Sequence, residues 1–111
     1  MSTRKLENRE WKPYFDQFAA ELEGKYVEIE VAGSAFGSQT ESEWAPLIGI
    51  TYDPKNDLLE IATDNIDHLI SKPREIYVDV DFEGLHSVEA IDPNGNKHII
   101  RLKSPLLLSP P

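Results

Sequence analysis

The sequence predicts a single α+β domain in which an N-terminal helix packs on a strongly bent, mainly antiparallel sheet of about six short strands. Apolar residues first recur with the period of a helix and then alternate with the period of a strand. The turn-forming clusters between strands lie too close together for crossover helices, so the strands must be mainly antiparallel. A sheet this small curls strongly, which favours a small open barrel. The analogy with SH3-like and Sm-like barrels concerns the fold alone.

The N-terminal helix is indicated by four large apolar side chains with helical spacing, which would lie along one helix face. Gly24 supplies a stop signal after them. We expect this face to pack on the sheet, and a partner-binding helix is the alternative. The four residues are Trp11, Phe15, Phe18 and Leu22.

The strand signals fall between turn-forming clusters. A short helix or helical turn is expected at NIDHLIS, before Pro73. For the last hairpin, a turn centred on Asn94 and Gly95 would place Ile91 opposite His98. Neither face of that ladder is cleanly apolar, so a bulge is expected or the register is shifted by one residue. The expected strands cover residues 25–31, 46–52, 58–63, 74–82, 85–91 and 97–103.

The domain boundaries follow from composition. Residues 1–10 are polar and predicted to be a flexible N-terminus, residues 11–103 form the single domain, and residues 104–111 are a tail rich in proline and leucine. There is no cysteine, no signal peptide core and no apolar run approaching the roughly 20 residues of a membrane span. These features favour a cytoplasmic protein.

The charge argues against one class of function. Eleven Lys and Arg against twenty Asp and Glu give a net charge of −9. Nucleic-acid binding needs a basic surface to neutralise phosphates, so a nucleic-acid-binding small barrel is the third and least favoured hypothesis.

No metal or cofactor site is predicted. The stretch DVDFEGLH resembles the start of a calcium loop opening at Asp79, but its twelfth position, which needs a bidentate glutamate, is Ala90. The three histidines lack the short spacings of zinc ligands, and no glycine-rich phosphate loop or catalytic serine motif is present.

The alternative enzyme hypothesis is a small-molecule or metal-dependent enzyme that uses Asp64, Asp67 and His68. A structural role for this segment is favoured, because Ile66, Leu69 and Ile70 could anchor a short helix on the sheet. In that case His68 would be mostly exposed, without a dedicated partner.

The leading hypothesis is a non-enzymatic protein-interaction module. Residues 33–45 form a long polar loop that carries Phe36 and Trp44, and exposed aromatic residues are good interface anchors. Both rings could instead fold back onto the core. The tail could be a docking motif or could cover a sheet edge. Its candidate contact residues are Leu106, Leu107 and Leu108.

Five phrases are together similar to a family of small bacterial proteins of unknown function. They are WKPYFDQF, LEGKYVEIEVAG, EWAPLIGITYDPKNDLLEI, DHLISKPREIYVD and NGNKHIIRL, and the match spans roughly residues 11 to 103. The resemblance implies a bacterial, single-domain, cytoplasmic protein. It assigns no activity and no functional residue.

Overall fold

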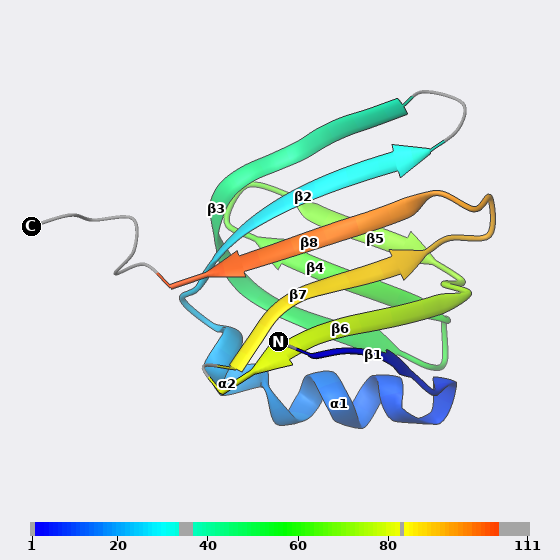
Figure 1. Cartoon of the computed structure of the whole chain (residues 1–111), viewed down its shortest axis with the longest axis horizontal. Coiled ribbons are helices and arrows are strands. Elements are labelled where there is room, and N and C mark those ends of the chain that lie inside the picture. The colour runs from blue at the N-terminus through cyan, green and yellow to red at the C-terminus, as the bar shows by residue number, and fades with distance from the viewer. Residues whose placement is uncertain (1, 34–36, 83, 105–111) are drawn as a thin grey trace, which may run out of the picture.

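Antiparallel strands dominate the computed structural model, which describes residues 2–33, 37–82 and 84–104. Within these residues eight strands form one sheet in the order β1-β6-β7-β8-β2-β3-β4-β5 (Figure 1). The sequence therefore underestimates the number of strands, while the antiparallel pairing and the α+β class are as predicted. The strands are β1 (Ser2–Leu6), β2 (Tyr26–Gly33), β3 (Gly37–Asp53), β4 (Leu58–Thr63), β5 (Asp67–Ser71), β6 (Glu75–Asp81), β7 (Gly84–Ile91) and β8 (Lys97–Lys103).

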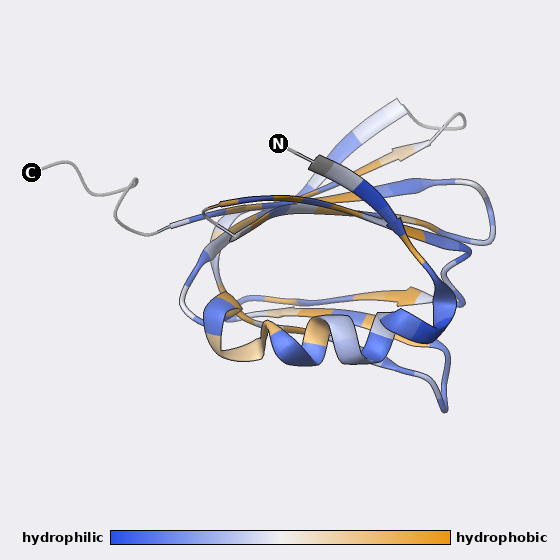
Figure 2. Ribbon diagram, turned by 60° about the horizontal axis from the view of Figure 1, so that its bottom comes forward, coloured by the Kyte–Doolittle hydropathy of each residue, from blue (hydrophilic) through white to orange (hydrophobic). Residues whose placement is uncertain are grey.

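The long strand β3 folds the sheet into two layers. Its first half pairs with β2 up to Pro46, and its second half pairs with β4 from Leu47 onwards. The first layer contains β1, β6, β7, β8, β2 and the start of β3, and the second contains the end of β3, β4 and β5 (Figure 2). In the described residues no pairing joins β1 to β5, so the bent sheet is not closed into a barrel.

The helical segment lies beside the end of β3 and is shorter than the apolar spacing predicts. It consists of a 3-10 turn η1 (Asn8–Glu10), helix α1 (Trp11–Gln17) and helix α2 (Ala19–Leu22). Phe18 interrupts it with a non-helical backbone (φ −95, ψ 3), and its N–H bonds to the Phe15 carbonyl. Burial is confirmed for Trp11, Phe15 and Leu22, whereas Phe18 is only partly buried because the helix breaks there.

The core fills the space between the two layers. Alternate residues of β2 and β4 point into it, including Val27, Ile29, Leu59 and Ile61, each 0% exposed. This is the period of two that a half-buried strand requires.

The segment that the sequence assigns to a short helix is strand β5. The Oγ1 atom of Thr63 accepts hydrogen bonds from the N–H groups of Asn65 and Ile66 and donates to the Ile66 carbonyl. These bonds close a tight turn that leads directly into antiparallel pairing with β4. Of the three expected apolar anchors only Ile70 is buried: Leu69 is its neighbour on β5 and points to the opposite face, and Ile66 lies in the turn before the strand.

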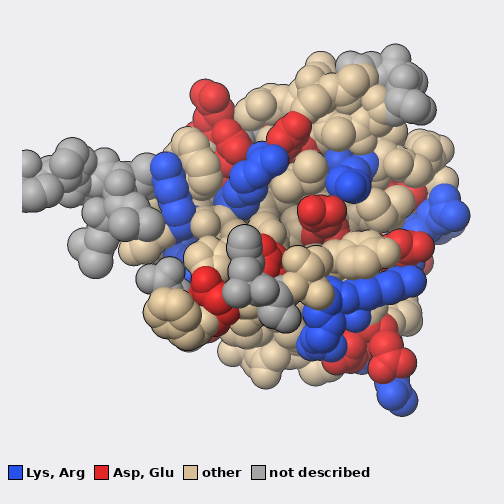
Figure 3. Space-filling view, in the orientation of Figure 1, with Lys and Arg blue, Asp and Glu red and all other residues tan. Residues whose placement is uncertain are grey.

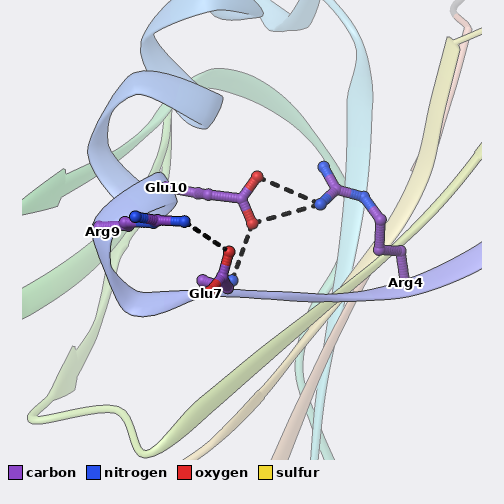
Figure 4. Close-up of polar contacts among 4 residues, drawn as sticks. All are labelled: Arg4, Glu7, Arg9 and Glu10. Atoms are coloured by element: carbon purple, nitrogen blue, oxygen red, sulfur yellow. Dashed lines mark hydrogen bonds and ion pairs between the residues drawn. The ribbon is translucent and has the colours of Figure 1, made fainter.

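Residues 2–6, expected within a flexible N-terminus, instead pair along β6 as strand β1. Leu6 is buried at the end of this strand. Arg4 donates to both carboxylate oxygens of Glu10 at 3.2 Å, and Glu10 also accepts the Glu7 N–H at 2.8 Å (Figure 4). The backbone bond from Glu7 and then the bond from Arg4 lower the pKa of Glu10. These bonds hold the corner between β1 and the helices.

The last hairpin has the register shifted by one residue from the predicted pairing. Ala90, rather than Ile91, lies opposite His98. The shift arises because the loop spans residues 92–96, where the Asp92 carboxylate accepts the N–H groups of Asn94 and Asn96. In this register β7 and β8 present a buried face that includes His98.

Among the described residues, no helix has the length and apolar character needed to cross a membrane.

Candidate functional site

A chain of three polar side chains crosses the interior of the molecule. The Nδ1 atom of His98 lies 2.8 Å from Nε2 of His68, and Nε2 of His98 lies 2.9 Å from a carboxylate oxygen of Asp92. The two rings are 5.0 Å apart and tilted by 53°. His98 is only 8% exposed, so its two ring nitrogens need partners inside the protein, and both have one.

The fold brings these residues together from three places. His98 is on β8, His68 is on β5 opposite the buried Ile61 of β4, and Asp92 begins the loop between β7 and β8. Because β5 and β8 belong to different layers, the bond between the histidines links the two layers directly. We call these three residues the histidine bridge.

The carboxylate of Asp92 determines which nitrogens carry protons. An ionised carboxylate only accepts hydrogen bonds, so Nε2 of His98 must be the donor to Asp92. With His98 neutral, its Nδ1 is then an acceptor and receives the Nε2–H of His68. The remaining Nδ1 of His68 is unprotonated, so the arrangement can take up a proton.

Burial and charge favour the neutral form of His68. Burial lowers the pKa of His68, and the neighbouring His98 lowers it further, whereas the carboxylate of Glu41 acts in the opposite direction. Burial alone would raise the pKa of Asp92, but hydrogen bonds from His98 and from the backbone of Asn96 and Asn94 outweigh it, and the pKa is lowered.

Beside the histidine bridge the surface is hollowed between the end of β5 and the loop before β8. The hollow has a volume of about 350 Å³ and is lined by Asp92 and His98. Residues 69–72 and 93–94 form the rest of its wall. Lys72 is the cationic residue in this wall.

The enzyme site considered from the sequence is not assembled. Asp67 is exposed on the outer side of β5, the neighbouring His68 points inward, and Asp64 is exposed in the preceding turn. The expectation that His68 is mostly exposed and without a partner is wrong, since it is half-buried and bonded to His98. The missed signal lies in the last hairpin: with Ala90 opposite His98, that histidine falls on the apolar face.

The proposed interaction residues have different positions. Trp44 is half-buried, has a positive φ of 41°, and its ring lies 3.9 Å below the ammonium group of Lys103. This combines partial burial with a cation–π contact. Phe36 and the tail residues Leu106, Leu107 and Leu108 lie outside the described residues.

The outer surface of the second layer carries exposed apolar side chains, among them Leu69, which was expected to anchor a short helix on the sheet. Ile48 is 60% exposed and Leu69 is 53% exposed. A hollow of about 450 Å³ adjoins Ile48, lined by Ala19 and Ala20 of α2 and by Ala62 of β4.

Two carboxylates on β4 and β5 border this apolar surface, and that of Glu23 also lines the hollow. Glu60 of β4 pairs with Leu69 of β5, and Asp67 is the next outward residue on β5. Burial raises the pKa of Glu60, and the charge of Asp67 and a hydrogen bond between the two raise it further. We call the surface around Ile48, Leu69, Glu60 and Asp67 the acidic-apolar face.

The described residues contain no group of three or more His, Cys, Asp or Glu side chains that could hold a metal ion. In the histidine bridge, the nitrogens that face each other are bonded together at 2.8 Å. It remains a prediction that the function of this protein uses no metal and no cofactor.

The fold defines a class: a small α+β protein built from a two-layered, open antiparallel sheet with a short broken helix. The model of a family of unknown function (DUF5335) matches residues 2–111, and the chain belongs to this family. An uncharacterized protein of Aquifex aeolicus (strain VF5) is 38% identical over 104 residues, which cover 93% of this chain and 94% of the relative. No solved structure matches the chain. The resemblance to a family of unknown function is thus confirmed.

Proposed function

We propose that this protein is a non-enzymatic interaction module whose acidic-apolar face binds a basic, partly apolar segment of another protein. The observation that carries the proposal is the exposure of Ile48, which lines the hollow that α2 and β3 share, and of Leu69, which pairs with Glu60 of the wall of that hollow. Single exposed apolar residues are common, but apolar residues gathered beside a concave surface indicate a binding site.

The carboxylates specify the chemistry of the partner. When both are ionised, the carboxylates of Glu60 and Asp67 repel each other, and this repulsion contributes, after burial, to the raised pKa of Glu60. A partner's Lys or Arg placed between them would remove this repulsion and form charge-assisted hydrogen bonds. Apolar side chains next to that cation would cover Ile48 and Leu69.

The opposite surface of the molecule has a different character. On the outside of the first layer, Lys and Arg side chains are interspersed with Asp and Glu (Figure 3). There Arg101 donates to Glu28 at 3.1 Å and to Glu30 at 2.8 Å, so charges of opposite sign are already paired. This distribution supports the acidic-apolar face over the first layer as the binding surface.

The experiment uses three short peptides of equal length as probes, with binding measured by calorimetry. One alternates Lys with Leu, the second alternates Glu with Leu, and the third alternates Lys with Ser. The proposal expects binding of the Lys–Leu peptide alone. The substitutions Ile48→Ser and Glu60→Gln should each weaken it by about tenfold, the effect of losing one apolar or charged anchor worth about 1.4 kcal/mol.

Two matched variants control for the type of residue. Phe82 is 96% exposed but lies in the turn between β6 and β7, so Phe82→Ser removes an exposed apolar group elsewhere. Glu89→Gln removes a carboxylate from β7 in the first layer. Both should bind like the unmodified protein. Equal binding of all three peptides, or a larger loss in Phe82→Ser than in Ile48→Ser, would contradict the proposed surface.

A further inference from the structure

We propose that the histidine bridge is a proton-operated latch that holds the edge strand β5 against the first layer and releases it at mildly acidic pH. The geometry supports this role in two ways. β5 is paired with β4 on one side only, and the bond from His68 to His98 crosses from one layer to the other. The latch thus acts on a strand with few other attachments.

The histidine bridge tolerates one added proton. If His98 carries it, both of its nitrogens are donors: Nε2 bonds to the Asp92 carboxylate and Nδ1 bonds to Nε2 of His68, which then has its proton on Nδ1. The link between the layers is preserved, and the bond to Asp92 becomes charge-assisted.

A second proton breaks the link. With both histidines charged, the Nδ1–H of His98 faces the Nε2–H of His68 across 2.8 Å, a distance that two donors cannot share. Two positive charges at this separation also repel each other strongly in a partly buried site. The ring of His68 must then move away from His98, and β5 carries that ring.

The charged groups around the histidine bridge decide the direction of the pH effect. Asp92 faces His98, Glu41 of β3 acts on His68, and Lys72 lines the hollow beside Asp92 and His98. Burial and His98 together outweigh Glu41, so the pKa of His68 is lower in the folded than in the unfolded chain. The unfolded chain therefore binds more protons near pH 6, and stability is lost as the pH falls through about 6.5 towards the lower folded value.

Releasing β5 would also disturb the acidic-apolar face, because Asp67 and Leu69 are on the same strand as His68. This consequence rests on the proposed function. The latch itself is tested without any partner, so failure of one proposal is distinguishable from failure of the other.

The test is hydrogen exchange of backbone amides at about pH 7.5 and about pH 5, corrected for the intrinsic pH dependence of exchange. Opening coupled to uptake of one proton increases the opening equilibrium constant by up to about tenfold per pH unit. Relative to the amides of β6 and β7, we expect the amides of β5 to lose protection against exchange by up to about tenfold for each pH unit below about 6.5. Equal changes in β5 and β6 would overturn the latch.

Two variants sharpen the test. In the double variant His68→Leu/His98→Leu the two polar rings are replaced by apolar side chains, and the extra pH dependence of β5 should disappear. In His86→Leu it should persist, because His86 belongs to the first layer, where its Nε2 lies 2.8 Å from a carboxylate oxygen of Asp81. An unchanged pH dependence in the double variant would refute the proposal.

A direct measurement on the unmodified protein is independent of whether the double variant folds. Nitrogen-detected NMR of the imidazole rings should find both His68 and His98 protonated on Nε2 at neutral pH. A proton on Nδ1 of His98 at that pH would contradict the hydrogen-bond directions on which the latch depends.

Discussion

The two open sides of the layered sheet are closed by different chemistry. On one side α1 lies beside β1 and the end of β3, and Trp11 contacts Tyr52 edge-to-face with ring centroids 5.1 Å apart. The indole Nε1 of Trp11 is buried without a hydrogen-bond partner among the described residues. On the other side the rings of His68 and His98 meet, and each contact is a hydrogen bond.

The difference teaches how each side responds to its surroundings. Apolar contacts are non-directional and carry no charge, so the helical side should keep its closure over a wide pH range. The histidine side depends on protonation and on the direction of each bond, so it can be opened without unfolding the core. Stability and sensitivity are therefore separated in space.

The largest loss of stability is expected from truncating a buried side chain on the helical side. Phe15 is 0% exposed, and Phe15→Ala should lower the free energy of unfolding by about 3–5 kcal/mol, the range for removing a core phenylalanine. Phe18→Ala is the matched control and should lose less, because Phe18 lies at the helix break and is partly exposed. Denaturant unfolding measures both. An equal loss in the two variants would mean that the break at Phe18 does not weaken its packing.

A smaller effect is expected from the histidine side. His68→Ala leaves Nδ1 of the buried His98 without a partner, and an unsatisfied buried polar atom costs about 1–3 kcal/mol. His86→Ala should be closer to neutral, since that side chain is 40% exposed. Equal unfolding free energies for the two variants at neutral pH would show that the histidine bridge contributes nothing specific.

The helical side was the more predictable of the two. The spacing of Trp11, Phe15 and Leu22 depends only on local periodicity, and the antiparallel order follows from the short distances between turns. Strand β5 was mistaken for a helix because its few residues fit both periods, and the bonds of Thr63 that set the turn are not visible in composition.

The histidine side could not be predicted for a physical reason. His68 and His98 are thirty positions apart along the chain, and their meeting depends on the fold of β3 and on the register of the last hairpin. A shift of one residue in that register moves His98 from the inner to the outer face. The acidic-apolar face was missed likewise, because the exposure of Leu69 follows from strand pairing.

The smallest effect tests whether the helical side is as insensitive to pH as its apolar contacts suggest. Besides the bonds of Arg4 and Glu10 at its corner, this side contains the buried polar contact of Tyr52, whose hydroxyl donates to the Asp57 carboxylate at 2.6 Å. Burial, followed by the bond to Asp57 and the charges of Asp57 and Asp53, raises the pKa of Tyr52 to about 12. A raised pKa means that the folded chain keeps a proton which the unfolded chain releases near pH 10. This contribution to stability is therefore complete below pH 10 and is lost as the pH rises towards 12.

Tyr52→Phe should remove the part of this loss of stability at alkaline pH that is due to Tyr52. It should also lower the unfolding free energy at neutral pH by about 0.5–1.5 kcal/mol, the net value of one hydrogen bond. Tyr77→Phe is the matched control, since the Tyr77 hydroxyl also donates to a carboxylate, that of Glu75 at 2.7 Å, but lies on the outer surface of β6. Unfolding curves at neutral and alkaline pH compare the two variants. If Tyr52→Phe loses as much stability at alkaline pH as the unmodified protein, the stability of the helical side does not depend on the ionisation of Tyr52.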